Sequence, residues 1–562
     1  MDPLIPRNVR ILRLKGTREA RARQHAEAVA ALDPKERENL ALTPLAQKNQ
    51  ILIDRASTRI PGGGRLMRGL YEALVWERFL RLPSQYRKRL EPFVRHSGIS
   101  KKRLWLALFQ PDMLMVLAAT ASPRTRNHFL QGLPGCSTVR VFTSEGAKFI
   151  RNLDYPAASY WERYPTVCYH EPTEPGFLKH VAITSLGIPS SGLTGWNEAG
   201  IALSLHAHFS KRVSFKGVPI FFLGEDILET ARTLDEAVQL CKLFKTMGSW
   251  ALNLSSFKEN RHVTVEMVGG KIHVREADRT TGIAHSNHFQ NPEFRQDELE
   301  FCADFQHDCT ARKSALETLA EHCSTDFDWK RALLELSNHR ESGHGEFRIF
   351  GNTSSVITTI QTVGFDPATD SIYLSIREET PVTHGPYLVL PRDPENLSTS
   401  GGPKVLDLGR PHPEAFMKAL HHFHQAYVSW QVRGDQPDVA HAFLIQAVES
   451  WPRDPHVLMQ LGYFELIAGQ TREAQQHFDQ CLSISGLGSH HRDLCHYFKG
   501  AALDILGNRE EAIRAYQSIT GRADVVPSLL KKAKRRLNRP FTRSLALRIE
   551  PDLQFVEPLN YP

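Results

Sequence analysis

The stretch that decides the fold of the central region is residues 135–154, GCSTVRVFTSEGAKFIRNLD. Its two arms alternate β-branched or aromatic residues with polar ones, and the TSEG between them favours a turn. This pattern predicts a β-hairpin. Because a hairpin folds the chain back on itself, we expect Arg151 and Asp154 to lie beside Cys136.

Further hairpin patterns follow this one along the chain. The expected strand pairs are 183–193 with 201–205 around a turn at 197–200, 263–268 with 271–274 around Gly269-Gly270, and 356–365 with 371–376. A helix is expected at 225–243, between the strands at 201–205 and 263–268. Many hairpins and few helices predict an α+β fold class with largely antiparallel sheets.

The texture of the sequence divides the chain into five parts. They are 1–135, a short strand at 9–14 followed by helices and a polar linker from 122; 136–390, the hairpin-rich domain; 391–413, a linker rich in Pro, Gly and Ser; 414–540, helical repeats; and 541–562, a tail. The change from helical to strand texture falls at Gly135-Cys136.

The helical region repeats a pattern of small and aromatic residues. Ala440, Leu444 and Ala447 are followed thirty-four residues on by Ala474, Phe478 and Cys481, and a further thirty-eight on by Ala512, Tyr516 and Ile519. These spacings are typical of tetratricopeptide repeats, in which small residues let paired helices approach closely. A generic helical-hairpin bundle remains the alternative. Such repeats can bind a protein partner, buttress a neighbouring domain or form a dimer.

Composition excludes several classes of protein. The 562 residues carry a net charge of +7 spread over a large surface, so no nucleic-acid partner is expected, and the basic run 531–536 is interpreted as a solvated helix face. The first ten residues have no apolar run typical of a secretory signal, and no stretch of eighteen apolar residues predicts a membrane span. Eight cysteines do not make a disulfide framework. We therefore expect a cytoplasmic protein.

The chemistry expected at Cys136 is nucleophilic attack on an amide carbon. A base must take the thiol proton. If the Gly135–Cys136 bond breaks, the new α-amine of Cys136, with an ordinary pKa of about 7.7–8.0, can serve as that base. Gly135 lacks a Cβ and tolerates a crowded approach to its carbonyl. Asp154 can hold the amine, and the charge of Arg151 favours the thiolate.

Six short motifs, in order along the chain, resemble those of the peptidase C45 family, the relatives of acyl-coenzyme A:6-aminopenicillanic acid acyltransferase. They are LKGT at 14–17, QH at 24–25, GCST at 135–138, RNLD at 151–154, NEAG at 197–200 and SNHF at 286–289. More distantly, the chain is similar to the choloylglycine hydrolase and penicillin V acylase group. The resemblance covers about 9–390. It implies the αββα sandwich of N-terminal-nucleophile hydrolases, followed here by the helical repeats.

The resemblance also implies roles for individual residues. Cys136 would be the nucleophile of both self-cleavage and turnover, and Asp154 would orient its amine and contact substrate. Asn287 would donate its side-chain N–H groups to an oxyanion hole. A second donor is expected near His206 or Ala207, as a backbone N–H. The substrate would be a linear amide or an acyl thioester, with no metal or organic cofactor required.

The sequence departs from the family pattern at two points. His206 stands where relatives commonly have Asn, which leaves the second oxyanion donor open. The family's later arginine has no clear counterpart, and Arg348, ahead of GNTSS at 351–355, is the candidate.

Each site residue also has a plainer interpretation. Cys136 can be an inert buried thiol, Arg151 an ion-pair partner, Asp154 a turn or cap residue, Asn287 a loop residue and His206 a core histidine. The alternative function is a catalytically inactive hydrolase-like domain in a repeat-bearing interaction scaffold. A separate cluster does not match paired-cysteine zinc spacing and predicts no metal; it consists of Cys302, His307, Cys309, His322 and Cys323.

Overall fold

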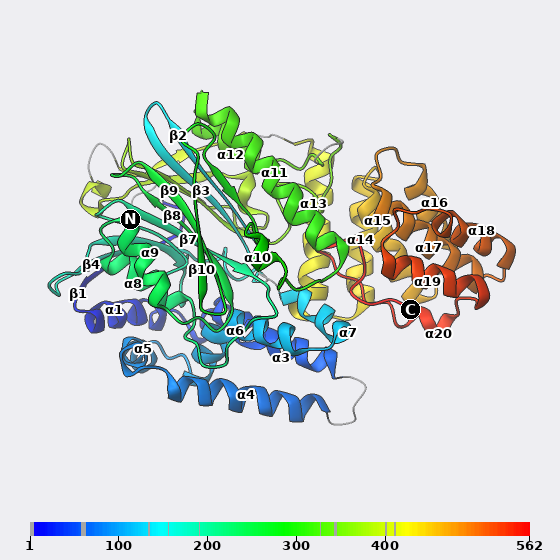
Figure 1. Cartoon of the computed structure of the whole chain (residues 1–562), viewed down its shortest axis with the longest axis horizontal. Helices are drawn as coiled ribbons and strands as arrows, with labels where there is room; N and C mark the ends of the chain where they lie inside the picture. The colour runs from blue at the N-terminus through cyan, green and yellow to red at the C-terminus, as the bar shows by residue number, and fades with distance from the viewer. Residues whose placement is uncertain are drawn as a thin grey trace. The chain divides into compact units, whose positions relative to one another are not determined.

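The chain folds into two compact units (Figure 1). The computed structural model describes residues 5–57, 63–132, 135–155, 157–189, 192–325, 327–341, 345–398, 402–409 and 412–562. The first unit comprises Met1–Glu300, Arg312–Ser337 and Thr358–Gly409, and the second comprises Phe301–Ala311, Asn338–Ile357 and Arg410–Pro562. The second unit thus includes two segments that precede the predicted repeats.

The amino-terminal part of the first unit is a strand followed by helices, as the sequence predicts, but the expected polar linker from residue 122 contains two further short helices. Its elements are β1 (Arg10–Gly16), α1 (Arg18–Ala30), α2 (Pro34–Glu38), α3 (Leu42–Ala56), α4 (Gly63–Arg81), α5 (Ser84–His96), α6 (Lys101–Thr120), α7 (Pro123–Arg126) and η1 (Asn127–Gly132). Helix α6 is buried along most of its length. Its Asp112 carboxylate accepts hydrogen bonds from Trp250 Nε1 at 2.9 Å and from the Ile220 N–H at 3.2 Å. The polar residues that interrupt this apolar segment therefore anchor a core helix.

Within the described parts of the chain, none of the helices combines the length and the apolarity that crossing a bilayer requires.

The larger sheet of the first unit has the order β1-β4-β5-β6-β7-β8-β9-β10. Its strands after β1 are β4 (Pro165–Pro172), β5 (His180–Ser185), β6 (Thr194–Asn197), β7 (Ile201–His208), β8 (Ser249–Ser256), β9 (Arg261–Val268) and β10 (Lys271–Glu276). All neighbours are antiparallel except β1 and β4, which are parallel. The parallel edge joins the amino-terminal segment to the hairpin-rich domain.

The second sheet has the order β11-β2-β3-β12-β13-β14-β15, antiparallel throughout. Its strands are β2 (Gly135–Thr143), β3 (Gly146–Asp154), β11 (Ile283–His285), β12 (Thr359–Asp366), β13 (Ser371–Ser375), β14 (Tyr387–Pro391) and β15 (Lys404–Leu406). The predicted 135–154 hairpin is confirmed as β2 and β3 in the middle of this sheet.

Hydrophobic side chains fix the order of the layers. One buried cluster joins the two sheets, with Val167, Ile183 and Trp196 from the first facing Phe365 and Leu374 from the second. A second cluster packs the outer face of the second sheet against α11 (Ala303–Thr325) and α12 (Trp329–Leu336), which Figure 1 shows alongside β2 and β3. Helices α8 (Phe221–Thr230) and α9 (Leu234–Leu243) pack on the first sheet. The sheets therefore lie between two helical layers.

The single helix predicted at 225–243 is wrong, because α8 and α9 are separate. Ala231 is extended, and Thr233 starts α9 by accepting a hydrogen bond from the Glu236 N–H with its side chain. The polar residues between the helices thus act as a helix stop and a new N-cap.

Two other predictions differ from the structure. The expected strand at 183–193 is wrong: β5 ends at Ser185, and β6 begins only at Thr194. The expected linker at 391–413 contains β15, which pairs with β14 and extends the second sheet. A strand of three residues gives little signal in a segment rich in Pro and Gly.

The carboxy-terminal part of the second unit is helical. Its elements are α13 (Glu414–Tyr427), the π-helical η4 (Val428–Arg433), α14 (Pro437–Ser450), α15 (Pro455–Ala468), α16 (Thr471–Ser483), α17 (Ser489–Ile505), α18 (Arg509–Thr520), α19 (Pro527–Asn538) and α20 (Arg543–Ala546). A Cβ on Gly462 would lie 2.6 Å from the Phe478 ring, and one on Gly500 would lie 2.7 Å from the Tyr516 ring. The small and aromatic residues of the predicted repeats therefore contact one another between neighbouring helices.

Candidate active site

The β2–β3 register brings the predicted site residues to one end of the hairpin. Gly135 pairs with Asp154, Cys136 with Leu153, and Thr138 with Arg151. Cys136 is buried, with 2% of its surface exposed. The expectation that Arg151 and Asp154 lie beside Cys136 is confirmed, because neighbouring antiparallel strands place them there.

Asn287 binds the backbone of Cys136. Its Oδ1 accepts the Cys136 N–H at 2.7 Å, and its Nδ2 donates to the Ala207 carbonyl at 3.0 Å. Strand β11 positions it, because His285 pairs with Thr138 on β2 and the chain then turns back toward Cys136. Since an amide nitrogen carries two hydrogens, Nδ2 keeps a second N–H for another acceptor.

Arg151 fixes the position of the sulfur. Its Nη2 lies 3.4 Å from Cys136 Sγ and also donates to the Leu205 carbonyl at 2.9 Å. Its Nη1 donates to the Leu193 carbonyl at 3.0 Å and to the Thr194 hydroxyl. These bonds hold a full positive charge beside the thiol in a buried setting.

The pKa of the Cys136 thiol reflects two opposing effects. Burial raises it, and the positive charge of Arg151 opposes that increase without cancelling it. The thiol of the uncleaved chain is therefore protonated near neutral pH, and nucleophilic attack needs a base that accepts its proton.

Asp154 lies directly against Gly135. A Cβ on Gly135 would be 3.1 Å from Asp154 Cβ and 3.2 Å from its Oδ2. The other carboxylate oxygen, Oδ1, accepts the Thr359 hydroxyl at 2.6 Å. Any larger residue at position 135 would have to displace this carboxylate, which gives a physical reason for glycine ahead of the cysteine.

Arg312, on α11, is a site residue that the sequence analysis missed. Its Nη1 donates to the Cys136 carbonyl at 2.8 Å and to Ser137 Oγ at 3.0 Å, and its Nη2 donates to Asn287 Oδ1 at 3.3 Å. The sequence candidate for this role, Arg348, belongs to the second unit and forms an ion pair with Glu341 at 3.1 Å. The sequence feature that could have identified Arg312 is a charged residue among the buried apolar positions of a helix.

His206 is engaged with the protein on both sides of its ring. Nε2 lies 2.6 Å from Thr138 Oγ1, and Nδ1 lies 3.2 Å from the Ser286 carbonyl. Burial, followed by the charge of Arg151, lowers its pKa well below the ordinary value, so the imidazole is neutral. Its side chain therefore links β2, β7 and the segment after β11, as a core histidine does.

Ala207 enters the site through its backbone, since its carbonyl accepts the Asn287 amide.

The cysteines and histidines of the 301–325 segment are divided between the two units. Cys302 and Cys309 belong to the second unit, and Cys323 packs in the cluster under the second sheet. All eight cysteines of the chain are buried.

Together these contacts hold a thiol, the backbone N–H of the same residue and a carboxylate in one buried cluster. Two arginines and an amide provide donors on either side. Such an arrangement can activate a thiol and stabilise negative charge that develops on an attacked carbonyl oxygen.

Known proteins give matches over part of the chain. Residues 141–380 match the family model of acyl-coenzyme A:6-aminopenicillanic acid acyl-transferase, a range that begins just after Cys136 and contains Arg151, Asp154 and Asn287. The chain is also similar to the solved structure of a Caenorhabditis elegans N-acylethanolamine-hydrolyzing acid amidase (NAAA) ortholog, at 18% identity over 42% of this chain and 93% of that chain, with a TM-score of 0.31. No curated protein matches significantly. The family match supports a hydrolase or acyltransferase of the N-terminal-nucleophile type.

Proposed function

We propose that this protein is a self-cleaving cysteine amidohydrolase or acyltransferase whose nucleophile is Cys136. The observation that carries the proposal is the pair of contacts on that one residue: Asn287 Oδ1 accepts its N–H at 2.7 Å, and Arg151 Nη2 lies 3.4 Å from its sulfur. The order of helix, sheet, sheet and helix is the order expected for an N-terminal-nucleophile hydrolase.

Maturation would begin with attack of the Cys136 sulfur on the Gly135 carbonyl carbon. The Gly135–Cys136 C–N bond breaks, and the proton lost by the thiol passes to the departing nitrogen, which becomes the α-amine. Water then hydrolyses the thioester, which leaves a carboxylate on Gly135 and restores the thiol. Asp154 leaves little room beside Gly135, since even a Cβ there would lie 3.2 Å from its Oδ2, and this confines the peptide that has to react.

Turnover would use the freed α-amine of Cys136 as the base. Asn287 Oδ1 already holds that nitrogen, and an unperturbed α-amine has a pKa of about 7.7–8.0, so it is partly neutral near pH 7. The thiolate attacks the substrate carbonyl, and the second N–H of Asn287 Nδ2 can stabilise the oxyanion. The acyl group on Cys136 then passes to water or to an amine.

Arg312 would act as a positioning residue in this scheme. By holding the carbonyl of Cys136 and the Oδ1 of Asn287, it fixes the nucleophile and the amide in one arrangement. Preorganised donors of this kind contribute because they need no rearrangement as charge develops.

The first test is the intact mass of the purified full-length protein, followed over days. We expect fragments corresponding to residues 1–135 and 136–562, no cleavage in Cys136→Ala, and normal cleavage in Cys168→Ala. Cys168 is a matched control because it is another buried thiol of the same unit, on β4. A wild-type chain that stays whole, or a Cys136→Ala chain that is cut at the same place, would overturn the proposal.

The second test concerns turnover. Cleaved protein is incubated with a panel of linear acyl amides and acyl thioesters, and the mass of the Cys136 peptide is measured. We expect an added acyl group on Cys136 with at least one member of the panel. Cleaved protein that acquires no acyl group and releases no product would instead favour an inactive domain on a repeat scaffold.

A further inference from the structure

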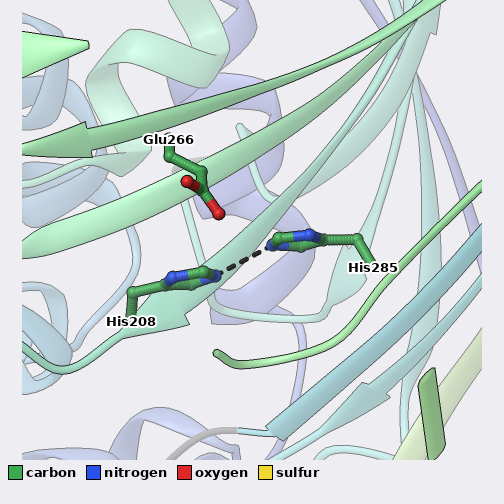
Figure 2. Close-up of side chains that lie close together, drawn as sticks. All are labelled: His208, Glu266 and His285. Carbon is green, nitrogen blue, oxygen red and sulfur yellow. Dashed lines mark hydrogen bonds between the residues drawn. The ribbon is translucent and has the colours of Figure 1, made fainter. Parts of the chain in front are cut away.

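Three buried side chains from different strands converge behind the candidate active site (Figure 2). They are His208 at the end of β7, Glu266 on β9 and His285 at the end of β11. Each offers one ligand atom, and the three atoms lie within 4.8 Å of one another. At most 1% of the surface of each residue is exposed. The first two come from one sheet and the third from the other.

The two imidazole rings meet edge to edge. Their Nε2 atoms lie 2.9 Å apart, and the ring planes differ by only 5°. At this distance, either one ring donates a hydrogen to the facing nitrogen of the other, or both rings turn a lone pair toward a common cation.

Glu266 completes the set and is held rigidly. Its Oε1 accepts the Gln290 N–H at 2.6 Å, and its Oε2 accepts the Asn291 N–H at 3.0 Å. In Figure 2 its carboxylate points toward the gap between the rings. These two bonds fix the carboxylate beside the two imidazole rings.

The ligand types and spacings fit a divalent transition metal. Two imidazole nitrogens and one carboxylate oxygen are ligands for Zn²⁺ and for other divalent transition metals. Zn²⁺–nitrogen bonds measure roughly 2.0–2.1 Å. Tetrahedral coordination would put the two nitrogens about 3.3 Å apart, so the rings need to separate only slightly. Three protein ligands leave one position for water.

A second histidine pair provides a comparison for His208 and His285. His170 and His180 stack with ring centroids 4.3 Å apart. Arg21 Nη1 lies 3.2 Å from His170 Nδ1, and Glu229, beside them, is paired with Arg21 and Arg18. There an arginine occupies the space next to the rings and neutralises the carboxylate. A cation bound by His208, Glu266 and His285 would occupy the corresponding place beside the rings.

We propose that His208, Glu266 and His285 form a binding site for a divalent transition metal such as Zn²⁺. The metal would fasten β7 to β11 where both strands enter the active site. His208 follows Ala207, whose carbonyl accepts the Asn287 amide, and His285 precedes Asn287 by two residues. The site therefore positions Asn287 relative to Cys136 and takes no part in bond making.

The test measures the metal directly, with the full-length chain produced without a polyhistidine tag in medium containing Zn²⁺ or Co²⁺. We expect about one metal ion per chain after gel filtration, visible Co²⁺ absorption typical of low coordination number, and a lower melting temperature after chelation. Glu266→Gln and His285→Asn should each reduce the metal content at least tenfold. His180→Asn, the matched control from the second histidine pair, should retain it.

Wild-type protein with no stoichiometric metal and no Co²⁺ spectrum would overturn the proposal and leave the two histidines as a hydrogen-bonded pair. Equal metal content in wild type and His285→Asn would overturn it too, because the metal would then bind elsewhere. The wild-type Co²⁺ spectrum keeps the test decisive if a variant fails to fold. Since metal content is measured independently of cleavage, the result does not depend on the proposed enzymatic function.

Discussion

Each unit contains a buried side-chain amide that bonds the backbone. One lies beside Cys136 in the first unit, and the other lies on a helix of the second unit that contacts residues 551–562. In the first unit, the buried amide of Asn287 bonds the backbone of Cys136, the proposed nucleophile. In the second unit, the buried amide of Gln460 on α15 donates to the carbonyls of Asp552 at 2.8 Å and Phe555 at 2.6 Å. A buried amide on a backbone is therefore no sign of chemistry until a nucleophile and a scissile bond lie beside it.

The helix face in the second unit is already occupied by residues 551–562. Gln431 in η4 bonds Leu553 and Asp552, Gln460 on α15 bonds the next turn of chain, and Tyr497 on α17 donates to the Pro562 carbonyl. Charged groups add to this contact, since His490 Nε2 lies 3.1 Å from Glu557 and the Glu557 N–H donates to Asp304 on α11 at 2.7 Å. A protein partner that used this face of the proposed tetratricopeptide repeats would have to displace the tail.

The largest expected difference between the two regions follows from Asn287→Ala. Removing this amide takes away the acceptor of the Cys136 N–H and a candidate oxyanion donor, so we expect turnover to fall by about 10²–10³-fold. Single-turnover cleavage and kcat measure the loss. Asn291→Ala is the control. It removes the side chain that caps α10 (Pro292–Arg295) but keeps the backbone N–H that bonds Glu266, so it should change stability without changing the rate. Equal rates in wild type and Asn287→Ala would place the oxyanion hole elsewhere.

A smaller effect on the same site is expected from Arg312→Met. The substitution keeps most of the side-chain length but removes charged hydrogen bonds to the Cys136 carbonyl and Asn287. Hydrogen bonds to charged groups contribute about 1.5–3 kcal/mol, so cleavage should slow by roughly 10- to 150-fold. Lys313→Met, its neighbour on α11, should leave the rate unchanged because Lys313 pairs with Glu317 instead. If Lys313→Met also slowed cleavage, the rate would depend on the total positive charge of α11 rather than on the position of the Arg312 guanidinium.

The sequence predicted the part of the site that is built from residues close to one another in the chain. Cys136, Arg151 and Asp154 belong to one hairpin, so their proximity follows from alternation and a turn. Asn287 was found only through its resemblance to a family motif, because nothing in the hairpin indicates that β11 pairs with β2. Strand order is set by the packing of the whole core, which a single sequence does not reveal.

Residues that meet only through tertiary structure were missed or misjudged. Arg312 lies on a helix far from the hairpin in sequence, and its one local signal is a cation among buried apolar neighbours, with 3% of its surface exposed. For His206 the sequence predicted only a backbone N–H near the oxyanion hole, and it gave no sign that the ring would contact Thr138 and Ser286. His208, Glu266 and His285 come from three strands, so no spacing in the sequence brings them together.

In the second unit, Gln460→Ala should affect stability and leave chemistry unchanged. Two backbone carbonyls of the tail would lose their donor in a buried setting, which typically costs about 1–3 kcal/mol. Hydrogen exchange of residues 551–562 and the free energy of unfolding measure this loss, while the rate of self-cleavage should stay at the wild-type value. Gln470→Ala, an exposed substitution between α15 and α16, is the control. Unchanged exchange in the tail would show that Gln460 does not hold it.

The smallest expected effect is a pH dependence of the second unit, carried by His490. Burial lowers its pKa, but the hydrogen bond with Glu557 and the charge of Asp304 outweigh this, and its pKa is raised overall. A raised folded-state pKa adds stability below the unfolded-state value of about 6.5, and that stability is lost as pH rises through the folded-state value. His490→Gln should therefore lower the melting temperature of the second unit at pH 5.5 more than at pH 9. His421→Gln provides the comparison, because His421 is an exposed histidine on another helix, α13. If His490→Gln lowered the melting temperature equally at both pH values, packing rather than charge would hold α17 against residues 551–562.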